Sequence, residues 1–237
     1  MNSLEYSGRD NLEVMRDARN YNRFLVDLVL AHAGGSEYVI DFGAGSGTFS
    51  VPVSKVSKRL VCIETDPVLC AKLSEQGLEV MGSLDSIDDN SVDYLYTLNV
   101  LEHIEDDLNV LKLWMQKLRV GGKLFVYVPA FEALFSSMDH KVGHHRRYTK
   151  GGLVAKLKRA GFKVVQAKYA DSMGYFATLI FKAFDTGSGD LNPRLLKAYD
   201  RWVFPFSRFL DFFASALFGK NVYVIAEKAP EKSDQMS

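Results

Sequence analysis

Short apolar runs alternate with segments of helical periodicity along almost the whole chain. The apolar runs have the length and the flanking turn residues of buried strands. They cover residues 37–43, 59–64, 77–83, 92–100, 123–129, 163–170 and 221–228. The helical segments cover residues 17–35, 48–57, 67–77, 106–122 and 151–162. Because strands that alternate with helices build parallel sheets covered on both faces, we predict an α/β protein with a doubly wound, mostly parallel, seven-stranded sheet.

One helical segment, residues 106–122, has a regular apolar face. The residues on this face are Leu108, Leu111, Met115 and Leu118. Their spacing predicts an amphipathic helix, and the two glycines at 121–122 are expected to end it.

A long aromatic segment, residues 171–220, separates the last two predicted strands. We treat residues 1–237 as one domain in which this segment is a helical insert. Its second predicted helix, 201–218, has a narrow polar stripe and a broad apolar face. The stripe consists of Ser207, Arg208, Asp211 and Ser215, and the apolar face of Phe206, Phe209, Leu210, Phe213 and Leu217. We expect the apolar face to pack on the sheet or on the other helix of the insert; a dimer interface, a substrate lid, or contact with a bilayer or a lipid-linked acceptor are the alternatives.

Composition limits the classes of partner. The chain has 29 basic and 29 acidic residues and a formal net charge of zero, so no global charge favours nucleic acid. Its two cysteines, Cys62 and Cys70, form no disulfide framework or metal-binding spacing. The first residues lack a signal-peptide pattern, and no charge-free apolar run reaches the length of a transmembrane helix. We therefore expect a cytoplasmic protein, monomeric or homodimeric, without a transmembrane segment.

A glycine-rich loop follows the first predicted strand and has the pattern Asp-x-Gly-x-Gly-x-Gly, from Asp41 to Gly47. A dinucleotide-binding fingerprint would require glycine where Thr48 stands, and a P-loop would require Gly-Lys-Ser/Thr. The carboxylate of Asp41 would repel a pyrophosphate and attract an ammonium group. The loop therefore favours a cationic ligand without phosphate.

This loop resembles motif I of the class I S-adenosylmethionine-dependent methyltransferases. The resemblance implies that S-adenosylmethionine is the cofactor and that the backbone at residues 43–45, Gly43, Ala44 and Gly45, passes close to it. Asp41 would orient the aminocarboxypropyl end of the cofactor. Glu64, which ends the second strand, would accept the ribose hydroxyls, with Thr65 beside it.

The resemblance extends to three further parts of the cofactor site. Ser83 and the backbone of Leu84 would face the adenine, at a place where the family often has an aspartate. Asn99 and Val100 would lie under the methionine portion, with His103 nearby. Tyr21, in a helix that leads into motif I, would approach the amino-acid end of the cofactor.

Residues 143–162 are similar to a Gly-His-x-Arg-Arg-Tyr segment of bacterial small-molecule methyltransferases. The predicted catalytic residues are His144 and His145, since a hydroxyl acceptor needs a base and histidine suits this role near neutral pH. A small-molecule acceptor is therefore expected, with oxygen as the methylated atom. The predicted acceptor-binding residues are Arg146, Arg147 and Tyr148. In the alternative interpretation, the two arginines form salt bridges with Asp139 that hold a loop in place.

A metal site is not expected. Some related quinone and phenol O-methyltransferases have a Glu-x-x-Glu-His run that can bind a divalent ion, but here Asn99 replaces the first carboxylate. A set of Asp139, His140 and His144 lacks a compact motif.

Three other functions were weighed against methyl transfer. An NAD(P)-dependent reductase would need Gly at position 48 and a catalytic Ser/Tyr-x-x-x-Lys pair, which is not found. A binding protein that keeps the cofactor but has no turnover is the second alternative. RNA modification is disfavoured by the neutral charge and the lack of a basic stripe.

Overall fold

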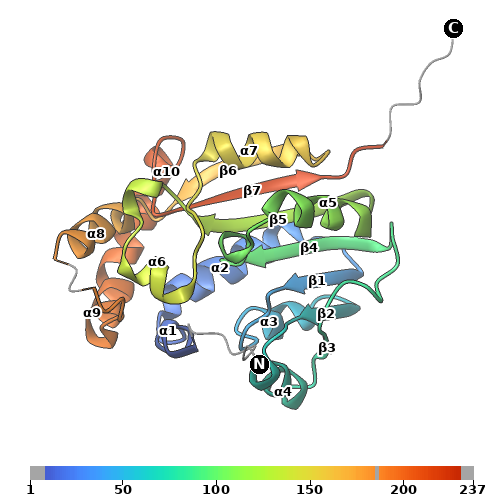
Figure 1. Ribbon diagram of the computed structural model, residues 1–237, viewed down its shortest axis with the longest axis horizontal. Coiled ribbons are helices and arrows are strands. Elements are labelled where there is room, and N and C mark those ends of the chain that lie inside the picture. Colours follow the sequence, from blue (N-terminus) through green and yellow to red (C-terminus); the bar gives the residue numbers. More distant parts are fainter. Residues whose placement is uncertain (1–8, 185–186, 231–237) are drawn as a thin grey trace, which may run out of the picture.

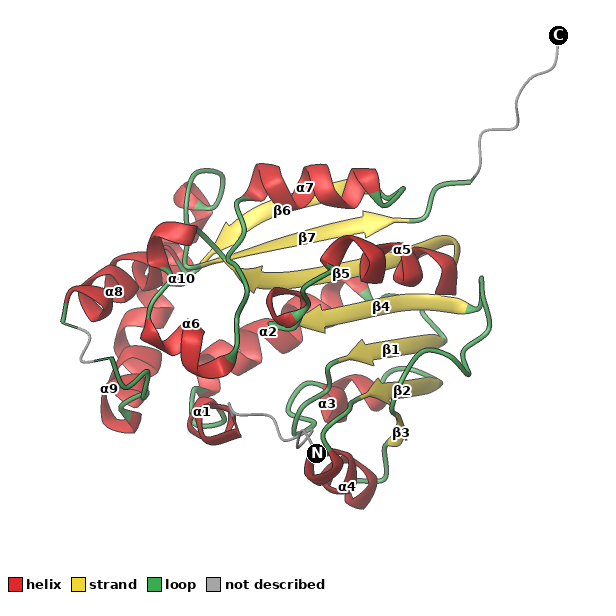
Figure 2. Ribbon diagram, viewed as in Figure 1, coloured by secondary structure: helices red, strands yellow, loops and turns green. Residues whose placement is uncertain are grey.

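The computed structural model describes residues 9–184 and 187–230, and this part of the chain forms a seven-stranded sheet covered by helices (Figures 1 and 2). The strand order is β3-β2-β1-β4-β5-β7-β6. All neighbouring pairs are parallel except those of β7, which runs antiparallel to both β5 and β6. The predicted fold class, a mostly parallel seven-stranded sheet with a helical insert before the last strand, is confirmed.

The strands and helices follow the predicted order. The strands are β1 (Tyr38–Phe42), β2 (Arg59–Ile63), β3 (Glu79–Met81), β4 (Val92–Leu98), β5 (Leu118–Pro129), β6 (Lys163–Ala170) and β7 (Asn221–Glu227). The longer helices are α2 (Arg19–His32), α4 (Pro67–Glu75), α5 (Asp107–Lys117), α7 (Lys150–Arg159), α8 (Ser172–Ala183) and α10 (Phe204–Ala214). The shorter ones are α1 (Arg9–Met15), α3 (Ser50–Ser54), η1 (Leu101–His103), η2 (Glu132–Leu134), α6 (Ser137–Val142), α9 (Pro193–Ala198) and η3 (Tyr199–Val203).

The sheet has an apolar core on each face. Successive strand residues point to opposite faces, so Ile40 packs in one core with Trp114 of α5, and Val39 packs in the other with Leu25 of α2. All four side chains are fully buried. This two-sided burial explains why the central strands read as continuous apolar runs.

The predicted helix over 106–122 is too long. Helix α5 ends at Lys117, and Leu118 already pairs with Val92 of β4 as the first residue of β5. The register between these strands shifts after this pair, and Gly121 has a φ of 76°. Leu118 is fully buried in the strand, so its apolar character continued the helical pattern past the end of the helix.

Left-handed backbone follows three strands at their carboxyl ends. Asn99 after β4, Phe131 after β5 and Asp171 after β6 have φ values of 54°, 61° and 60°. Such conformations are costly for residues with a side chain and tend to persist at functional sites. The carboxyl edge of the sheet is also where open α/β folds bind their ligands.

The insert between β6 and β7 consists of α8, α9, η3 and α10, and lies at one end of the sheet (Figure 1). Contrary to expectation, the apolar face of α10 packs on neither the sheet nor α8. Two residues of its polar stripe are buried instead, Ser207 and Asp211, which are bonded to the first residues of α8. Arg208 of the stripe is exposed, as are Phe209 and Phe213. Asp200 of η3 further ties the insert to α2 by accepting from the backbone N–H groups of Asn20 and Tyr21. Within the described residues, no helix has the length and apolar character needed to cross a membrane.

Candidate active site

The glycine loop turns sharply after β1 and packs against the residues that follow β4. Gly43 has a φ of 81°, and a Cβ at this position would lie 2.3 Å from Cγ2 of Val100. Gly45 has a φ of 57°, but a Cβ there would meet no described atom within 4 Å. Gly43 is therefore required by the packing of Val100. The open space over Gly45 is where a cofactor could approach the backbone.

Asp41 is buried beneath this loop. Its Oδ2 atom accepts hydrogen bonds from the hydroxyls of Ser50 and Tyr96, at 2.6 and 2.7 Å. Burial raises the pKa of the Asp41 carboxyl to about 6, although both hydrogen bonds act in the opposite direction. Because both bonds use the same oxygen, the predicted interaction with the ammonium group of the cofactor would use Oδ1, directly or through water.

Asp41 should make the stability of the cofactor-free protein depend on pH. A carboxyl whose pKa is higher in the folded state stabilises the fold at low pH, and this contribution is lost as pH rises through about 4 to 6. We expect a loss of about 2–3 kcal/mol of unfolding free energy across this window. In the Asp41→Asn variant this loss should disappear. Urea unfolding of both proteins from pH 4 to pH 7.5 measures this loss. If the unfolding free energies of the two proteins change with pH in parallel, Asp41 does not titrate in this range.

Glu64 connects the end of β2 to the glycine loop. Its Oε2 accepts from the backbone N–H of Gly45 at 2.9 Å, and its Oε1 accepts from the backbone N–H groups of Thr65 and Asp66. The carboxylate is thus held beside the open space over Gly45. This placement is compatible with the predicted ribose contact, while Thr65 contributes its backbone and has an exposed side chain.

Glu64→Ala should weaken S-adenosylmethionine binding by about 1–3 kcal/mol, the range for a hydrogen bond lost from a charged group. This corresponds to about a 5- to 150-fold rise in Kd, measured by titration calorimetry. Glu79→Ala is the matched control, because Glu79 pairs with Arg59 on the protein surface and should leave Kd unchanged. An unaltered Kd for Glu64→Ala would exclude Glu64 from the cofactor site.

The predicted adenine-facing turn is exposed at Ser83 and buried at Leu84. The hydroxyl of Ser83 donates to the Asp85 carboxylate at 2.8 Å. The side chain of Leu84 belongs to the core, so only its backbone could contact a cofactor. Asp85 was not among the predicted site residues. It places an acid in this turn two positions after Ser83, where the family often has an aspartate.

Asn99 and Tyr21 meet where β4 ends and α2 passes behind the sheet. The backbone N–H of Asn99 donates to the carbonyl of Tyr127, and the hydroxyl of Tyr21 lies 3.3 Å from that of Tyr127. Burial raises the pKa of Tyr21 well above its ordinary value, so it is a neutral phenol. Both residues remain predicted contacts of the amino-acid end of the cofactor.

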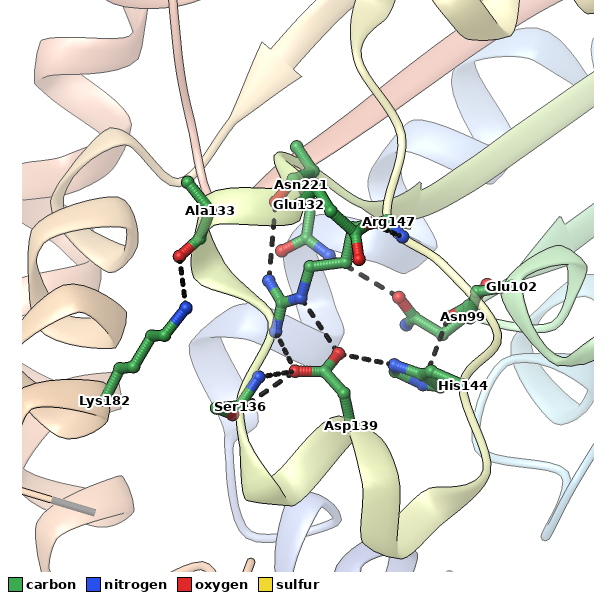
Figure 3. A network of polar contacts seen from close by, with 11 residues as sticks. Asn99, Glu102, Glu132, Ala133, Ser136, Asp139, His144, Arg147, Lys182 and Asn221 are labelled. Atoms are coloured by element: carbon green, nitrogen blue, oxygen red, sulfur yellow. Dashed lines mark hydrogen bonds and ion pairs between the residues drawn. The ribbon is translucent and has the colours of Figure 1, made fainter.

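A buried polar network surrounds Asp139 of α6 (Figure 3). Arg147 donates from Nε and Nη2 to the two carboxylate oxygens, each at 2.9 Å. Nδ1 of His144 lies 2.6 Å from Oδ1 of Asp139. Burial by itself would raise the pKa of Asp139, but the hydrogen bonds from His144 and Arg147 bring it well below its ordinary value.

His144 is oriented by this ionised carboxylate. Since the ionised Asp139 can only accept, the neutral imidazole of His144 would carry its proton on Nδ1 and its lone pair on Nε2. Nε2 lies 3.7 Å from Oε1 of Glu102, and the ring makes an edge contact with His103 at a centroid distance of 4.6 Å. His144 thereby contacts η1, which comes directly after Val100, the residue that packs against the glycine loop.

Glu102 is a candidate site residue that the sequence prediction missed. Its side chain has no exposed surface, and neither carboxylate oxygen has a hydrogen-bond partner among the described residues. Burial raises its pKa to about 8. Burial is the main cause that lowers the pKa of His103 to about 4. Glu102 comes shortly after a buried strand, and the sequence pattern does not show whether an acid at such a position is buried or lies in a surface turn.

The residues after His144 are occupied by contacts within the protein. The Arg147 side chain is only 1% exposed and is bonded to Asp139, and the buried hydroxyl of Tyr148 donates to the Leu101 carbonyl and to Asp107. Arg146 also binds Asp107, whereas the side chain of His145 is exposed. The predicted acceptor contacts of Arg147 and Tyr148 do not fit this burial. The alternative, in which salt bridges of the two arginines with Asp139 hold a loop in place, fits for Arg147, whereas Arg146 pairs with Asp107 instead.

Three donors converge at this point. Glu102, His103 and His144 offer ligand atoms that all lie within 4.8 Å of one another, so together they could hold a divalent ion. The prediction of no metal considered Glu102 and His103 with Asn99, and did not anticipate that His144 folds back onto them. No local pattern signals this, because η1 and the segment after α6 are distant in sequence.

The geometry defines a class of protein. A glycine loop, an acid at the end of the next strand and polar residues after β4 lie along the carboxyl edge of a mostly parallel sheet. This arrangement is typical of α/β proteins that bind a nucleoside cofactor at that edge.

Comparisons with known proteins relate part of the chain to a family. Residues 40–126 match the family model described as a methyltransferase domain. The chain is 26% identical over 154 residues to a probable S-adenosylmethionine-dependent methyltransferase of Mycolicibacterium smegmatis, covering 62% of this chain and 58% of that protein. It is 29% identical over 98 residues to the ubiquinone biosynthesis O-methyltransferase of Xanthomonas euvesicatoria, covering 37% and 41%. The chain thus spans less than two thirds of these relatives.

Solved structures show the same fold. One is an S-adenosylmethionine-dependent methyltransferase from Thermotoga maritima, with a TM-score of 0.62, 16% identity, and coverage of 92% of this chain and 94% of that one. Another is the geranyl diphosphate C-methyltransferase of Streptomyces coelicolor in complex with S-adenosyl-L-homocysteine, with a TM-score of 0.63, 11% identity, and coverage of 87% and 77%. The matched methyltransferase domain, the curated relatives and the shared fold together support a class I S-adenosylmethionine-dependent methyltransferase, with S-adenosylmethionine as the cofactor.

Proposed function

We propose that this protein transfers the methyl group of S-adenosylmethionine to an oxygen atom of a small-molecule acceptor, with His144 as the general base. The observation that carries this proposal is the Asp139–His144 pair, which orients Nε2 toward Glu102 in the segment after β4. The bound cofactor supplies an activated methyl group. Nε2 of His144 would accept the proton of the acceptor hydroxyl, and the bound cofactor would supply the methyl group that this oxygen receives.

The chain's own residues fit this cofactor. The open space over Gly45 accommodates a ligand against the backbone, Glu64 offers a carboxylate to the ribose, and buried Asp41 offers one to the ammonium group.

His144 fits the role of base better than His145. The His145 backbone N–H donates to the Glu102 carbonyl at 2.8 Å and its side chain is exposed, so nothing orients that ring. The similarity to an O-methyltransferase supports oxygen as the acceptor atom. The net charge of zero supports a small-molecule acceptor over nucleic acid.

Two measurements test the proposed function. Calorimetry with S-adenosylmethionine, S-adenosylhomocysteine and NADH should show binding of the first two only. Incubation with labelled methyl donor and fractionated metabolites should then transfer label to a hydroxylated compound. Binding of NADH alone would restore the reductase alternative, and cofactor binding without turnover on any fraction would favour a non-catalytic binding protein.

The base and a metal ligand are mutually exclusive roles for His144, because both use the Nε2 lone pair. We expect methyl transfer to be unchanged after dialysis against EDTA, since the proposed mechanism needs no ion. Metal content by mass spectrometry and activity before and after dialysis measure this. Loss of activity that returns with Mn²⁺ or Zn²⁺ would instead assign Glu102, His103 and His144 to a metal centre.

A further inference from the structure

Helix α10 turns its apolar side outward. Its outward side chains are between 54% and 83% exposed, together with that of Trp202 in the preceding turn. They are Trp202, Phe206, Phe209, Phe212, Phe213 and Leu217. Single exposed apolar residues are ordinary on protein surfaces, but a contiguous group of this size marks an interaction site.

Buried hydrogen bonds fix this orientation. Asp211 accepts from the backbone N–H groups of Asp171 and Ser172, both at 2.9 Å. The hydroxyl of Ser207 accepts from the backbone N–H of Met173 and donates to the Asp171 carboxylate. The start of α8 has N–H groups that need acceptors, and the polar side of α10 supplies them. Rotating α10 to bury its aromatic side would break these buried bonds.

Helix α8 extends the apolar surface. Its exposed apolar side chains, with that of the residue after the helix, are Phe176, Leu179, Ile180 and Phe184. The ring of Phe218, just after α10, contacts that of Phe176 at a centroid distance of 5.6 Å and joins the two groups. We call these exposed side chains of α8, α10 and Trp202 the insert face.

The charges around the insert face are mostly positive. In the described part of the insert, the exposed basic residues are Lys182, Arg194, Lys197, Arg201 and Arg208. Of these, Lys197 pairs with Asp17, which lies after α1, and Lys182 donates to the Ala133 carbonyl. The exposed acid in the same part is Asp190, which pairs with Lys141, while Asp200 and Asp211 are buried. Arg201 also lies over the ring of Trp202, 5.0 Å from its centroid. An aromatic surface with a basic rim is typical of helices that lie in the interface of an anionic membrane.

We propose that the insert face binds the surface of a lipid bilayer that contains anionic phospholipids. The aromatic side chains enter the headgroup boundary and the basic rim contacts lipid phosphates. A second copy of the chain fits the face less well, because a two-fold contact between identical faces brings the basic rims together. This inference goes beyond methyl transfer and holds whatever the acceptor is.

The insert is attached to the segment that bears the catalytic network. Nζ of Lys182 donates to the carbonyl of Ala133, and Lys141 of α6 pairs with Asp190 (Figure 3 shows the first contact). Because α6 also carries Asp139, a membrane bound to the insert face lies next to the elements that orient His144.

Vesicle binding tests the proposal, and the two tryptophans of the chain provide the signal. Trp202 is 70% exposed and Trp114 is fully buried, so only Trp202 should respond to lipid. We expect vesicles of phosphatidylcholine and phosphatidylglycerol to shift tryptophan emission to the blue, and brominated lipid to quench it. Trp202→Phe should remove the shift while sedimentation with vesicles remains.

Phe209→Ser/Phe213→Ser should reduce sedimentation with these vesicles by about tenfold or more, since it removes two apolar anchors. Val56→Ser/Val120→Ser is the matched control; both valines are exposed and lie outside the insert, and binding should persist. The proposal is overturned if the protein binds no vesicles, or if the phenylalanine variant binds as well as the unmodified chain. It is equally overturned if light scattering shows a homodimer that the phenylalanine variant dissociates.

Discussion

His144→Ala is expected to lower kcat for methyl transfer by about 10²–10⁴-fold, the usual contribution of a general base. Nδ1 of His144 is held by the ionised Asp139, so the variant loses the oriented Nε2 lone pair. The affinity for S-adenosylmethionine should stay within a few-fold, because the predicted cofactor contacts lie on other residues. The rate is measured with labelled methyl donor and the acceptor that the metabolite screen identifies.

His145→Ala is the control for this experiment. The two histidines are adjacent in sequence, but the side chain of His145 is exposed and has no partner that orients it in the described contacts. Its replacement should change kcat only slightly. Equal losses in the two variants would show that the segment acts as a whole, and an unchanged kcat in His144→Ala would remove the base from the mechanism.

Asp139→Ala is expected to reduce the free energy of unfolding by about 3–5 kcal/mol, because it leaves the buried guanidinium of Arg147 without its counter-ion. Both side chains are almost fully buried, and Asp139 also accepts from His144 and from the backbone N–H of Ser136. The loss is measured by urea unfolding at neutral pH, where Asp139 is ionised.

The matched control for stability is Asp190→Ala, which removes an exposed ion pair with Lys141 and should leave the unfolding free energy essentially unchanged. If Asp139→Ala does not fold, the Asp139→Ala/Arg147→Ala double variant can be measured instead, because it removes both buried charges. It is expected to be more stable than the single Asp139→Ala variant, in which Arg147 stays buried without a partner. A single variant as stable as the unmodified protein would show that the pair does not stabilise the fold.

Local patterns in the sequence were sufficient for the fold class and the cofactor family. Strand and helix periodicity are repeated within a few residues, so each element could be recognised by itself and their alternation predicts the parallel sheet. The glycine loop from Asp41 to Gly47 is likewise contiguous, and the acid Glu64 stands at the end of the next strand along the chain. The main error in the elements is the end of α5, which was predicted too far along the chain. Leu118 is buried in the strand, and a buried strand residue is apolar just as a buried helix residue is, so the apolar pattern did not mark the change.

Only the tertiary structure decided the composition of the polar network around Asp139 and the orientation of the insert. Glu102 and His144 come together because η1 and the segment after α6 meet at the carboxyl edge of the sheet, and no periodicity records a contact between residues so far apart. Periodicity predicts that α10 has two sides, but the side that is buried depends on the backbone N–H groups of α8 that Asp211 and Ser207 satisfy. Buried polar partners from distant segments therefore decided both features.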